Sequence, residues 1–216
     1  RCKMSNKRGL LFIVSGPSGA GKSTLVNRVI ARVPGLVYSV SYTTRPQRPT
    51  EVEGRDYYFV SRREFERMRE AGELIEWAEV YGYLYGRSRV AIERDLAAGR
   101  DVILSIDVQG AAVFRKLSLP VVSIFILPPS FEVLAERLRA RKTDARPSVE
   151  QRLAIAREEV SHYRHFDYVI VNDRLDEALA LLEAIILAER HRRERMEEDL
   201  QPILRTFEVS DRLEGA

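Results

Sequence analysis

The sequence of 216 residues has a single cysteine, Cys2, which cannot form an internal disulfide. Only three histidines are present, and they form no cluster with this cysteine, so no structural zinc site is expected. No apolar run approaches the roughly 18 residues of a membrane span, and the N-terminal segment lacks a basic-then-apolar signal pattern. We therefore expect a cytoplasmic protein with no membrane partner.

The sequence also lacks a strong excess of positive or negative charge. The formal net charge is +3, from 35 lysines and arginines against 32 acidic residues, which favours anionic partners without requiring nucleic acid. The basic residues are scattered and form no recognisable nucleic-acid-binding motif, so no nucleic-acid partner is expected. A hydrophobic content of 45% with 31% charged residues is typical of a folded globular chain rather than a disordered one.

Short apolar runs alternate with helical patterns along most of the chain. The strands expected from these patterns lie at 10–15, 38–42, 102–107, 121–127 and 168–172. The expected helices lie at 22–33, 61–71, 89–98, 130–141, 148–162 and 175–200. Near-continuous apolar strands separated by helices predict an α/β fold, with a parallel sheet flanked by helices on both faces.

Two segments differ from this alternation. Residues 40–88 are rich in aromatic residues and turn signals, which favours a small mixed or antiparallel lobe inserted into the core. Residues 139–148 are polar and basic with a proline, and we interpret them as a lid loop between two helices. The ranges left for the core domain are 9–39, 89–138 and 149–188.

The two ends of the chain are interpreted separately. Residues 1–8 form an N-terminal tail, in which residues 1–3 read as additions before a natural start at Met4. Residues 189–216 form a charged C-terminal helix and tail. A solvated helix extension is the favoured interpretation of this run, and a contact between subunits of a homo-oligomer remains as the alternative.

The strongest motif is GPSGAGKS at 16–23, between an apolar strand and a helix. Its glycines allow the backbone to approach a polyphosphate, and its N–H groups and the helix N-terminus face the anion. Lys22 supplies a positive charge, and the Ser23 hydroxyl can ligate Mg²⁺. The residues expected to hold the phosphates of ATP are Gly16, Pro17, Ser18, Gly19, Ala20, Gly21, Lys22, Ser23 and Thr24. A structural glycine-rich turn is the alternative, and the strand–loop–helix context disfavours it.

A second binding site is indicated inside the inserted segment. Arginine forks and tyrosine hydroxyls suit a phosphate monoester, and the segment carries Arg45, Arg48 and several tyrosines. Glu76, beside Trp77, can accept two hydrogen bonds, as from the N1–H and 2-amino group of a guanine. Each signal also has an ordinary interpretation, in which the tyrosines pack and Glu76 is a surface carboxylate.

The sequence resembles the bacterial guanylate kinases over about residues 9–190. The motifs that carry the resemblance are SVSYTTRPQRPTEVEGRDYYF at 39–59, ELIEWAEVYGYLYG at 73–86, IDVQG at 106–110, FILPPS at 125–130 and DYVIVND at 167–173. The resemblance implies a P-loop kinase that uses Mg²⁺ to transfer the γ-phosphoryl group of ATP to GMP, and also to dGMP.

The resemblance also implies roles for individual residues. Ser41 and Glu76 would contact the guanine, and Asp107 would lie near the base or the magnesium. The whole implied GMP site is Ser41, Arg45, Arg48, Tyr57, Glu76, Tyr85 and Asp107. The implied catalytic set is Lys22, Arg45, Arg137, Arg141 and Arg152. Asn172 would lie near the adenine of ATP. Without the resemblance, Arg141 and Arg152 read equally well as solvated helix arginines.

Two positions depart from the family pattern. Arg87 stands where the family usually has serine or threonine, and Ser105 replaces the first aspartate of the usual Asp-Ile-Asp. They keep two alternatives open: a P-loop kinase for another monophosphate, and a catalytically weak guanylate-kinase-like binding module. Glu76 together with Ser41 argues against the first alternative, and the intact Lys22 motif argues against the second.

Overall fold

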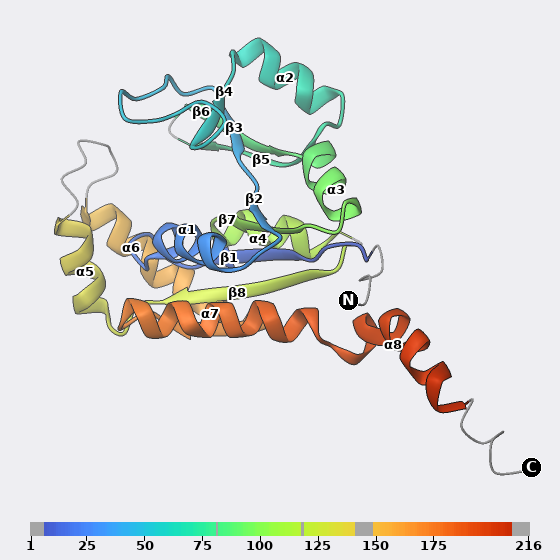
Figure 1. The fold of residues 1–216 in the computed structure, drawn as a ribbon. Coiled ribbons are helices and arrows are strands. Elements are labelled where there is room, and N and C mark those ends of the chain that lie inside the picture. Colours follow the sequence, from blue (N-terminus) through green and yellow to red (C-terminus); the bar gives the residue numbers. More distant parts are fainter. Residues whose placement is uncertain (1–6, 81, 118, 141–148, 209–216) are drawn as a thin grey trace, which may run out of the picture.

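The protein has the α/β fold with a parallel sheet that the sequence predicts, as the computed structural model shows (Figure 1). The structure describes residues 7–80, 82–117, 119–140 and 149–208. The core sheet has the order β2-β7-β1-β8-β9, and every neighbouring pair is parallel. Its strands are β1 (Leu11–Ser15), β2 (Leu36–Tyr38), β7 (Asp101–Ser105), β8 (Val121–Leu127) and β9 (Tyr168–Val171).

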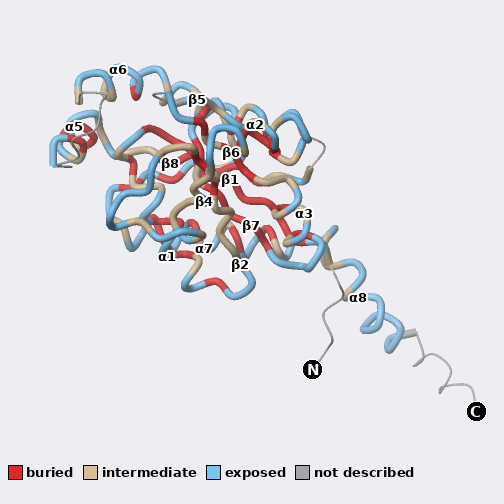
Figure 2. Tube along the Cα trace, turned by 90° about the horizontal axis from the view of Figure 1, so that it is seen from above, coloured by how far each residue is buried: buried red, intermediate tan, exposed pale blue. Residues whose placement is uncertain are grey.

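Helices cover both faces of this sheet. On one face, α1 (Lys22–Arg32) and α7 (Leu175–Arg190) pack on side chains such as Phe12 and Ile124. On the other face, α3 (Arg89–Ala97) and α4 (Val108–Arg115) pack on Leu11 and Leu104. Every residue of β1 is buried, and the buried trace runs through the central strands in Figure 2. The central strand therefore places its C-terminal end, and the loop that follows it, on a rigid support.

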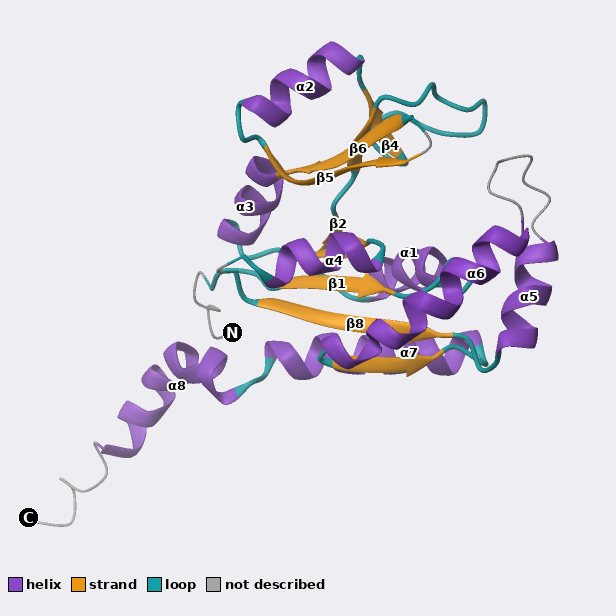
Figure 3. Ribbon diagram, turned by 180° about the vertical axis from the view of Figure 1, so that it is seen from behind, coloured by secondary structure: helices purple, strands orange, loops and turns teal. Residues whose placement is uncertain are grey.

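A second sheet lies apart from the core sheet (Figure 3). Its order is β4-β3-β6-β5, with β3 (Ser41–Thr43), β4 (Tyr57–Phe59), β5 (Leu74–Val80) and β6 (Tyr83–Ser88). The β3–β4 pair is parallel and the other pairs are antiparallel, so the sheet is mixed. We call this sheet, with α2 (Arg62–Glu70), the lobe. Phe65 and Met68 of α2 pack against Leu74 and Leu84 and cover one face of the second sheet. The predicted domain boundaries remain predictions.

Two elements that the sequence predicts as continuous are each divided into two in the structure. The strand expected at 38–42 is two strands in different sheets: β2 ends at Tyr38, and β3 begins at Ser41. The helix expected at 175–200 is α7 followed by α8 (Arg193–Glu208). At this break, Arg192 turns back and donates to the buried carboxylate of Glu189. No glycine or proline marks either break in the sequence.

Three further boundaries differ from prediction. The strand expected at 102–107 ends at Ser105, since Asp107 is the N-cap of α4, a helix that the sequence analysis did not identify. The helix expected at 148–162 is α6 (Val149–Glu159), followed by a 3-10 helix, Val160–His165. The helix expected at 130–141 is α5 (Phe131–Ala140), and residue 141 lies outside the described residues.

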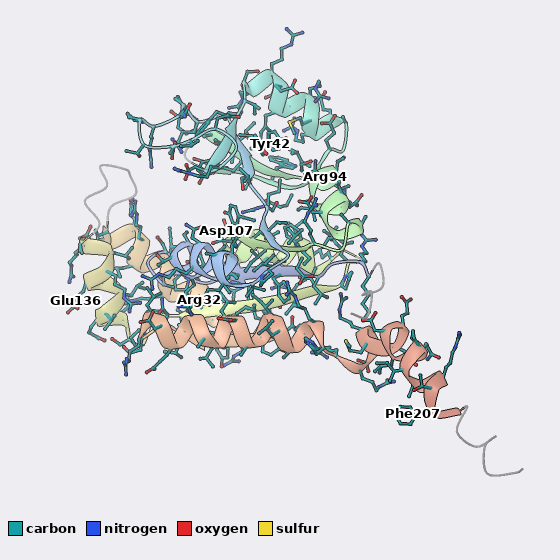
Figure 4. All side chains as sticks on the ribbon, viewed as in Figure 1. Arg32, Tyr42, Arg94, Asp107, Glu136 and Phe207 are labelled. Carbon is teal, nitrogen blue, oxygen red and sulfur yellow. The ribbon has the colours of Figure 1, made fainter. Side chains whose placement is uncertain are left out.

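The C-terminal helix α8 extends away from the core, and the label of Phe207 marks its far end in Figure 4. An ion pair between Lys7 and Asp199 anchors it to the N-terminal segment, and Arg195 donates to the carbonyl oxygen of Arg8 at 2.9 Å. Its part in a homo-oligomer stays a prediction. Within the described ranges, no helix has the length and apolar character needed to cross a membrane. A cytoplasmic location likewise stays a prediction.

Candidate functional site

The loop after β1 is built for close backbone approach. Gly16 has φ of 137°, and a Cβ there would lie 2.1 Å from the carbonyl oxygen of Ile126. Gly21, the N-cap of α1, has φ of 95°, and a Cβ there would lie 2.3 Å from Nδ2 of Asn172. A side chain at either position would collide with neighbouring atoms, so only glycine fits. The loop thereby presents backbone N–H groups at the start of α1, where an anion is favoured.

A cavity of about 230 Å³ opens over this loop, and we call it the loop cavity. It is lined by Gly16, Ser18, Gly19, Gly21, Lys22, Ser23, Asp107 and Glu159. The Lys22 ammonium donates to the carbonyl oxygens of Gly16 at 2.5 Å and Pro17 at 3.0 Å, which draws it against the loop. Pro17 and Ala20 are buried, and Thr24 points to solvent from α1. These three predicted residues do not line the cavity.

Glu159 is a cavity residue that the sequence analysis missed. It ends α6, far along the chain from the loop, and no motif surrounds it. Burial raises its pKa above that of an ordinary glutamate, the nearby Asp107 carboxylate acts in the same direction, and the Lys22 charge and the Ser18 N–H act against it. A carboxylate held in a partly desolvated cavity with a lysine is a candidate for a role in ligand binding.

The raised pKa of Glu159 gives a prediction about stability. A carboxyl group whose pKa is higher in the folded than in the unfolded state destabilises the fold as pH rises through the folded-state pKa. Replacing Glu159 with glutamine should therefore raise the melting temperature at neutral pH. The gain should shrink as the pH falls through the folded-state pKa, and it should vanish below the ordinary glutamate pKa. Thermal melts of both proteins from pH 4 to pH 8 measure this. A gain that is the same at every pH would contradict the assignment.

Two of the residues expected at the adenine and over the phosphates, Asn172 and Arg137, are tied to the phosphate loop. Asn172 is buried, and its Nδ2 donates to the carbonyl oxygen of Ala20 at 2.8 Å, so it braces the phosphate loop. Arg137 on α5 donates to the carbonyl oxygen of Asn172 at 3.0 Å. Arg152 on α6 is half-buried and does not line the cavity. Arg141, and the expected lid from residue 141 onward, lie outside the described residues. These roles stay predictions.

A larger cavity, of about 470 Å³, lies between the lobe sheet and the C-terminal end of β7. We call it the lobe cavity. Its lining residues are Ser41, Tyr57, Glu76, Trp77, Ala78, Tyr85, Arg87, Ser105, Ile106, Asp107, Gln109, Gly110 and Val113. Strand alternation explains the lobe side. Tyr85 and Arg87 face the cavity, whereas Leu84, just before Tyr85, packs under α2 and Gly86, between the two, faces the same way as Leu84. Its volume is in the range of small-molecule sites.

Glu76 is the buried acid of the lobe cavity, with 9% of the residue exposed. Arg87 Nη1 donates to its Oε1 at 2.6 Å. The same guanidinium donates through Nη2 to the backbone oxygen of Ser105 at 2.7 Å. The two positions that depart from the family pattern therefore meet, and they meet at the predicted base-contacting carboxylate. Sequence reasoning had no signal for this link.

The arginine and tyrosine residues expected to hold a phosphate are partly brought together. The Arg45 guanidinium lies 5.5 Å from the centre of the Tyr57 ring, and the Tyr57 and Tyr85 ring centres are 5.9 Å apart. Arg45 also donates to Glu51 at 2.6 Å. Burial acts to raise the pKa of Glu51, but the hydrogen bonds from Arg45 and the Arg48 N–H lower it overall. Arg48 itself is exposed, and the sequence analysis missed Glu51.

Asp107 connects the two cavities, because it lines both. Its Oδ1 accepts from the Gly110 N–H at 2.7 Å, which begins α4 and fixes the carboxylate at the end of the core sheet. Figure 4 shows Asp107 between the core and the lobe. The arrangement therefore holds two adjoining sites, one built for a polyphosphate and one with a buried acid and an arginine–tyrosine cluster.

Comparison with known proteins agrees with this arrangement. A family model described as Guanylate kinase matches residues 8–189. A guanylate kinase of Symbiobacterium thermophilum is 50% identical over 190 residues, 88% of this chain and 90% of the relative. One of Agrobacterium fabrum is 48% identical over 190 residues, 88% of this chain and 86% of the relative. The crystal structure of a guanylate kinase from Anaplasma phagocytophilum has a TM-score of 0.73 and 38% identity, and covers 90% of this chain and 95% of that one.

Proposed function

We propose that this chain, which belongs to the guanylate kinase family, is an ATP:GMP phosphotransferase. Its phosphate loop would hold ATP, and its lobe cavity would hold GMP. The products are ADP and GDP, and dGMP is accepted in place of GMP. The observation that carries the proposal is the pair of cavities that share Asp107. A donor and an acceptor bound there would meet end to end, which in-line transfer requires.

The protein's own contribution to this reaction is positioning and charge. Lys22 neutralises the outer phosphates of ATP, and the loop N–H groups orient them. Arg45, with the hydroxyls of Tyr57 and Tyr85, would hold the GMP phosphate. Glu76 would accept the N1–H and 2-amino hydrogens of the guanine, and Ser41 lines the same cavity. No residue needs to form a covalent intermediate.

The residues of the loop cavity fit a magnesium ion. Ser23, Asp107 and Glu159 offer hard oxygen donors, which Mg²⁺ prefers. Ser23 would hold the ion directly, and the two carboxylates could accept hydrogen bonds from its water ligands. Within the described part of the chain, no cluster of three His, Cys, Asp or Glu side chains forms a metal cage. A magnesium ion here would be held mainly by phosphates and water, and it would supply charge neutralisation of the transferring phosphoryl group.

A coupled assay of ADP release tests the proposal. We expect turnover with GMP and dGMP and little with AMP, CMP or UMP, since only guanine offers Glu76 two adjacent donors. Omitting Mg²⁺ should remove the activity. Preference for another monophosphate would favour the related-kinase alternative. Binding of GMP without ADP release would favour a catalytically weak binding module.

A further inference from the structure

We infer that Arg87 is a positioning residue of the base site: it fixes the Glu76 carboxylate and ties the lobe to the end of β7. The inference rests on the proposed function, because it concerns how the lobe cavity recognises the guanine of GMP. It also concerns this chain in particular, since the family usually has a hydroxyl residue at this position.

Strand register brings the two charges together. β5 and β6 pair antiparallel, and their register shifts between Leu74 and Glu76, which leaves Ile75 as an extra residue. Leu74 packs under α2, whereas Ile75 packs against the core domain. After this bulge, Glu76 lies directly opposite Arg87, and directly opposed residues project to the same face of a sheet. Without the extra residue, the alternation of β5 would turn Glu76 to the other face.

The contacts of Arg87 join the two sheets of the protein. Its Nη1 donates to Glu76 of β5 at 2.6 Å, and its Nη2 donates to the backbone oxygen of Ser105 at the end of β7. The guanidinium is planar and rigid, so holding one of its nitrogens at β7 also fixes where the other can meet a carboxylate. Arg87 therefore fixes the position of Glu76 relative to the core domain. In that domain, Asp107 lies two residues beyond Ser105.

The ion pair between Arg87 and Glu76 is buried, which strengthens the dependence of each charge on the other. Both side chains are only 8% exposed, so each charge depends on the other in place of water. Nε of Arg87 is buried with no hydrogen-bond partner among the described residues, and a buried unpaired N–H lowers stability. The pair is thus not the arrangement that folding stability alone would favour. Its two directed hydrogen bonds serve instead to hold the carboxylate in one orientation.

The consequence should appear in GMP binding rather than in chemistry. Glu76 can accept two base hydrogens only when its plane is aligned with the edge of the base, and Arg87 sets that plane. Arg87 is not among the residues that line the loop cavity, so ATP binding should not depend on it.

Arg87→Met tests this role, because methionine keeps an apolar stem and removes the fork. We expect the KM for GMP to rise roughly tenfold or more, with kcat and the KM for ATP within about threefold of the unaltered protein. Arg87→Lys should give an intermediate KM, since an ammonium keeps the charge without the bidentate geometry. Arg89→Met is the matched control: Arg89 lies two residues on, is 39% exposed, and should change none of these constants.

A double-mutant cycle with Glu76→Gln separates positioning from direct contact with the base. If Arg87 acts through Glu76, the Glu76→Gln, Arg87→Met protein should bind GMP no more weakly than Glu76→Gln alone. Fully additive losses would overturn the inference, because Arg87 would then contact GMP itself. If Arg87→Met does not fold, the cycle is measured with Arg87→Lys and read in the same way.

The inference and the proposed function fail differently. An unchanged KM for GMP in Arg87→Met, alongside a raised KM in Glu76→Gln, overturns only the inference. Absence of GMP turnover in the unaltered protein overturns the proposed function.

Discussion

Lys22→Ala is expected to reduce kcat by at least about a hundredfold, while the protein stays folded and still binds GMP. A preorganised charge aimed at the reacting group contributes this much in comparable sites. Lys22 lines the loop cavity and is drawn against the loop by two carbonyl oxygens. It has little packing to lose, because it lies at the surface of the cavity. Steady-state turnover of ATP and GMP, with GMP titration and a thermal melt, measures the three effects.

Lys116→Ala is the matched control for this experiment. Lys116 is the exposed C-cap residue of α4 and lines neither cavity. Its replacement should leave turnover and melting temperature unchanged. Wild-type turnover in Lys22→Ala would show that the loop cavity is not the site of phosphoryl transfer. Equal loss of activity in both variants would point to a general charge effect instead.

Glu76→Gln is expected to weaken GMP binding by about tenfold to over a hundredfold, with the affinity for ATP nearly unchanged. A hydrogen bond to a charged group contributes about 1.5–3 kcal/mol. The amide oxygen can still accept one hydrogen, but its NH₂ group would face a base donor. The structure adds a second effect, because Arg87 would keep its buried charge and lose the opposite charge of Glu76. The melting temperature should therefore fall as well.

Glu79→Gln provides the comparison on the same strand. Glu79 is 51% exposed and pairs only loosely with Arg62, at 3.5 Å. An exposed ion pair of this kind contributes little, so this variant should keep both its GMP affinity and its melting temperature. Titrations with GMP and ATP, together with thermal melts, separate the two variants. An equal loss for both nucleotides in Glu76→Gln would return Glu76 to a purely structural role.

Several of these features are visible in the sequence because they are local. The phosphate loop is eight contiguous residues between a strand and a helix, so glycine spacing, lysine and context can be read together. The apolar runs of β1 and β8 predict buried parallel strands, and the structure contains them. The family resemblance also came from contiguous motifs, and the family model confirms it.

Other features depend on where the chain goes next, which local patterns do not encode. The run at 38–42 reads as one strand, yet its halves pair with β7 and β6 in different sheets. No motif surrounds Glu159, and Glu51 lies within the motif at 39–59 without any local sign of its partner. Each becomes part of a site only through contacts made on folding. At the break between α7 and α8, Glu189 accepts hydrogen bonds from Arg192 and from Tyr168 of β9, a contact that no local pattern announces.

The sequence by itself thus determined the fold class, the family and the chemistry available at the phosphate loop, since each follows from residues that are neighbours in the chain. Only the tertiary structure decided what Arg87 and Ser105 do. One extra residue in β5 sets the register that faces Glu76 toward Arg87, and a parallel core sheet brings the end of β7 within hydrogen-bonding reach of the lobe. Register and the approach of two sheets are properties of distant segments packed together, so no pattern within either segment alone could specify them.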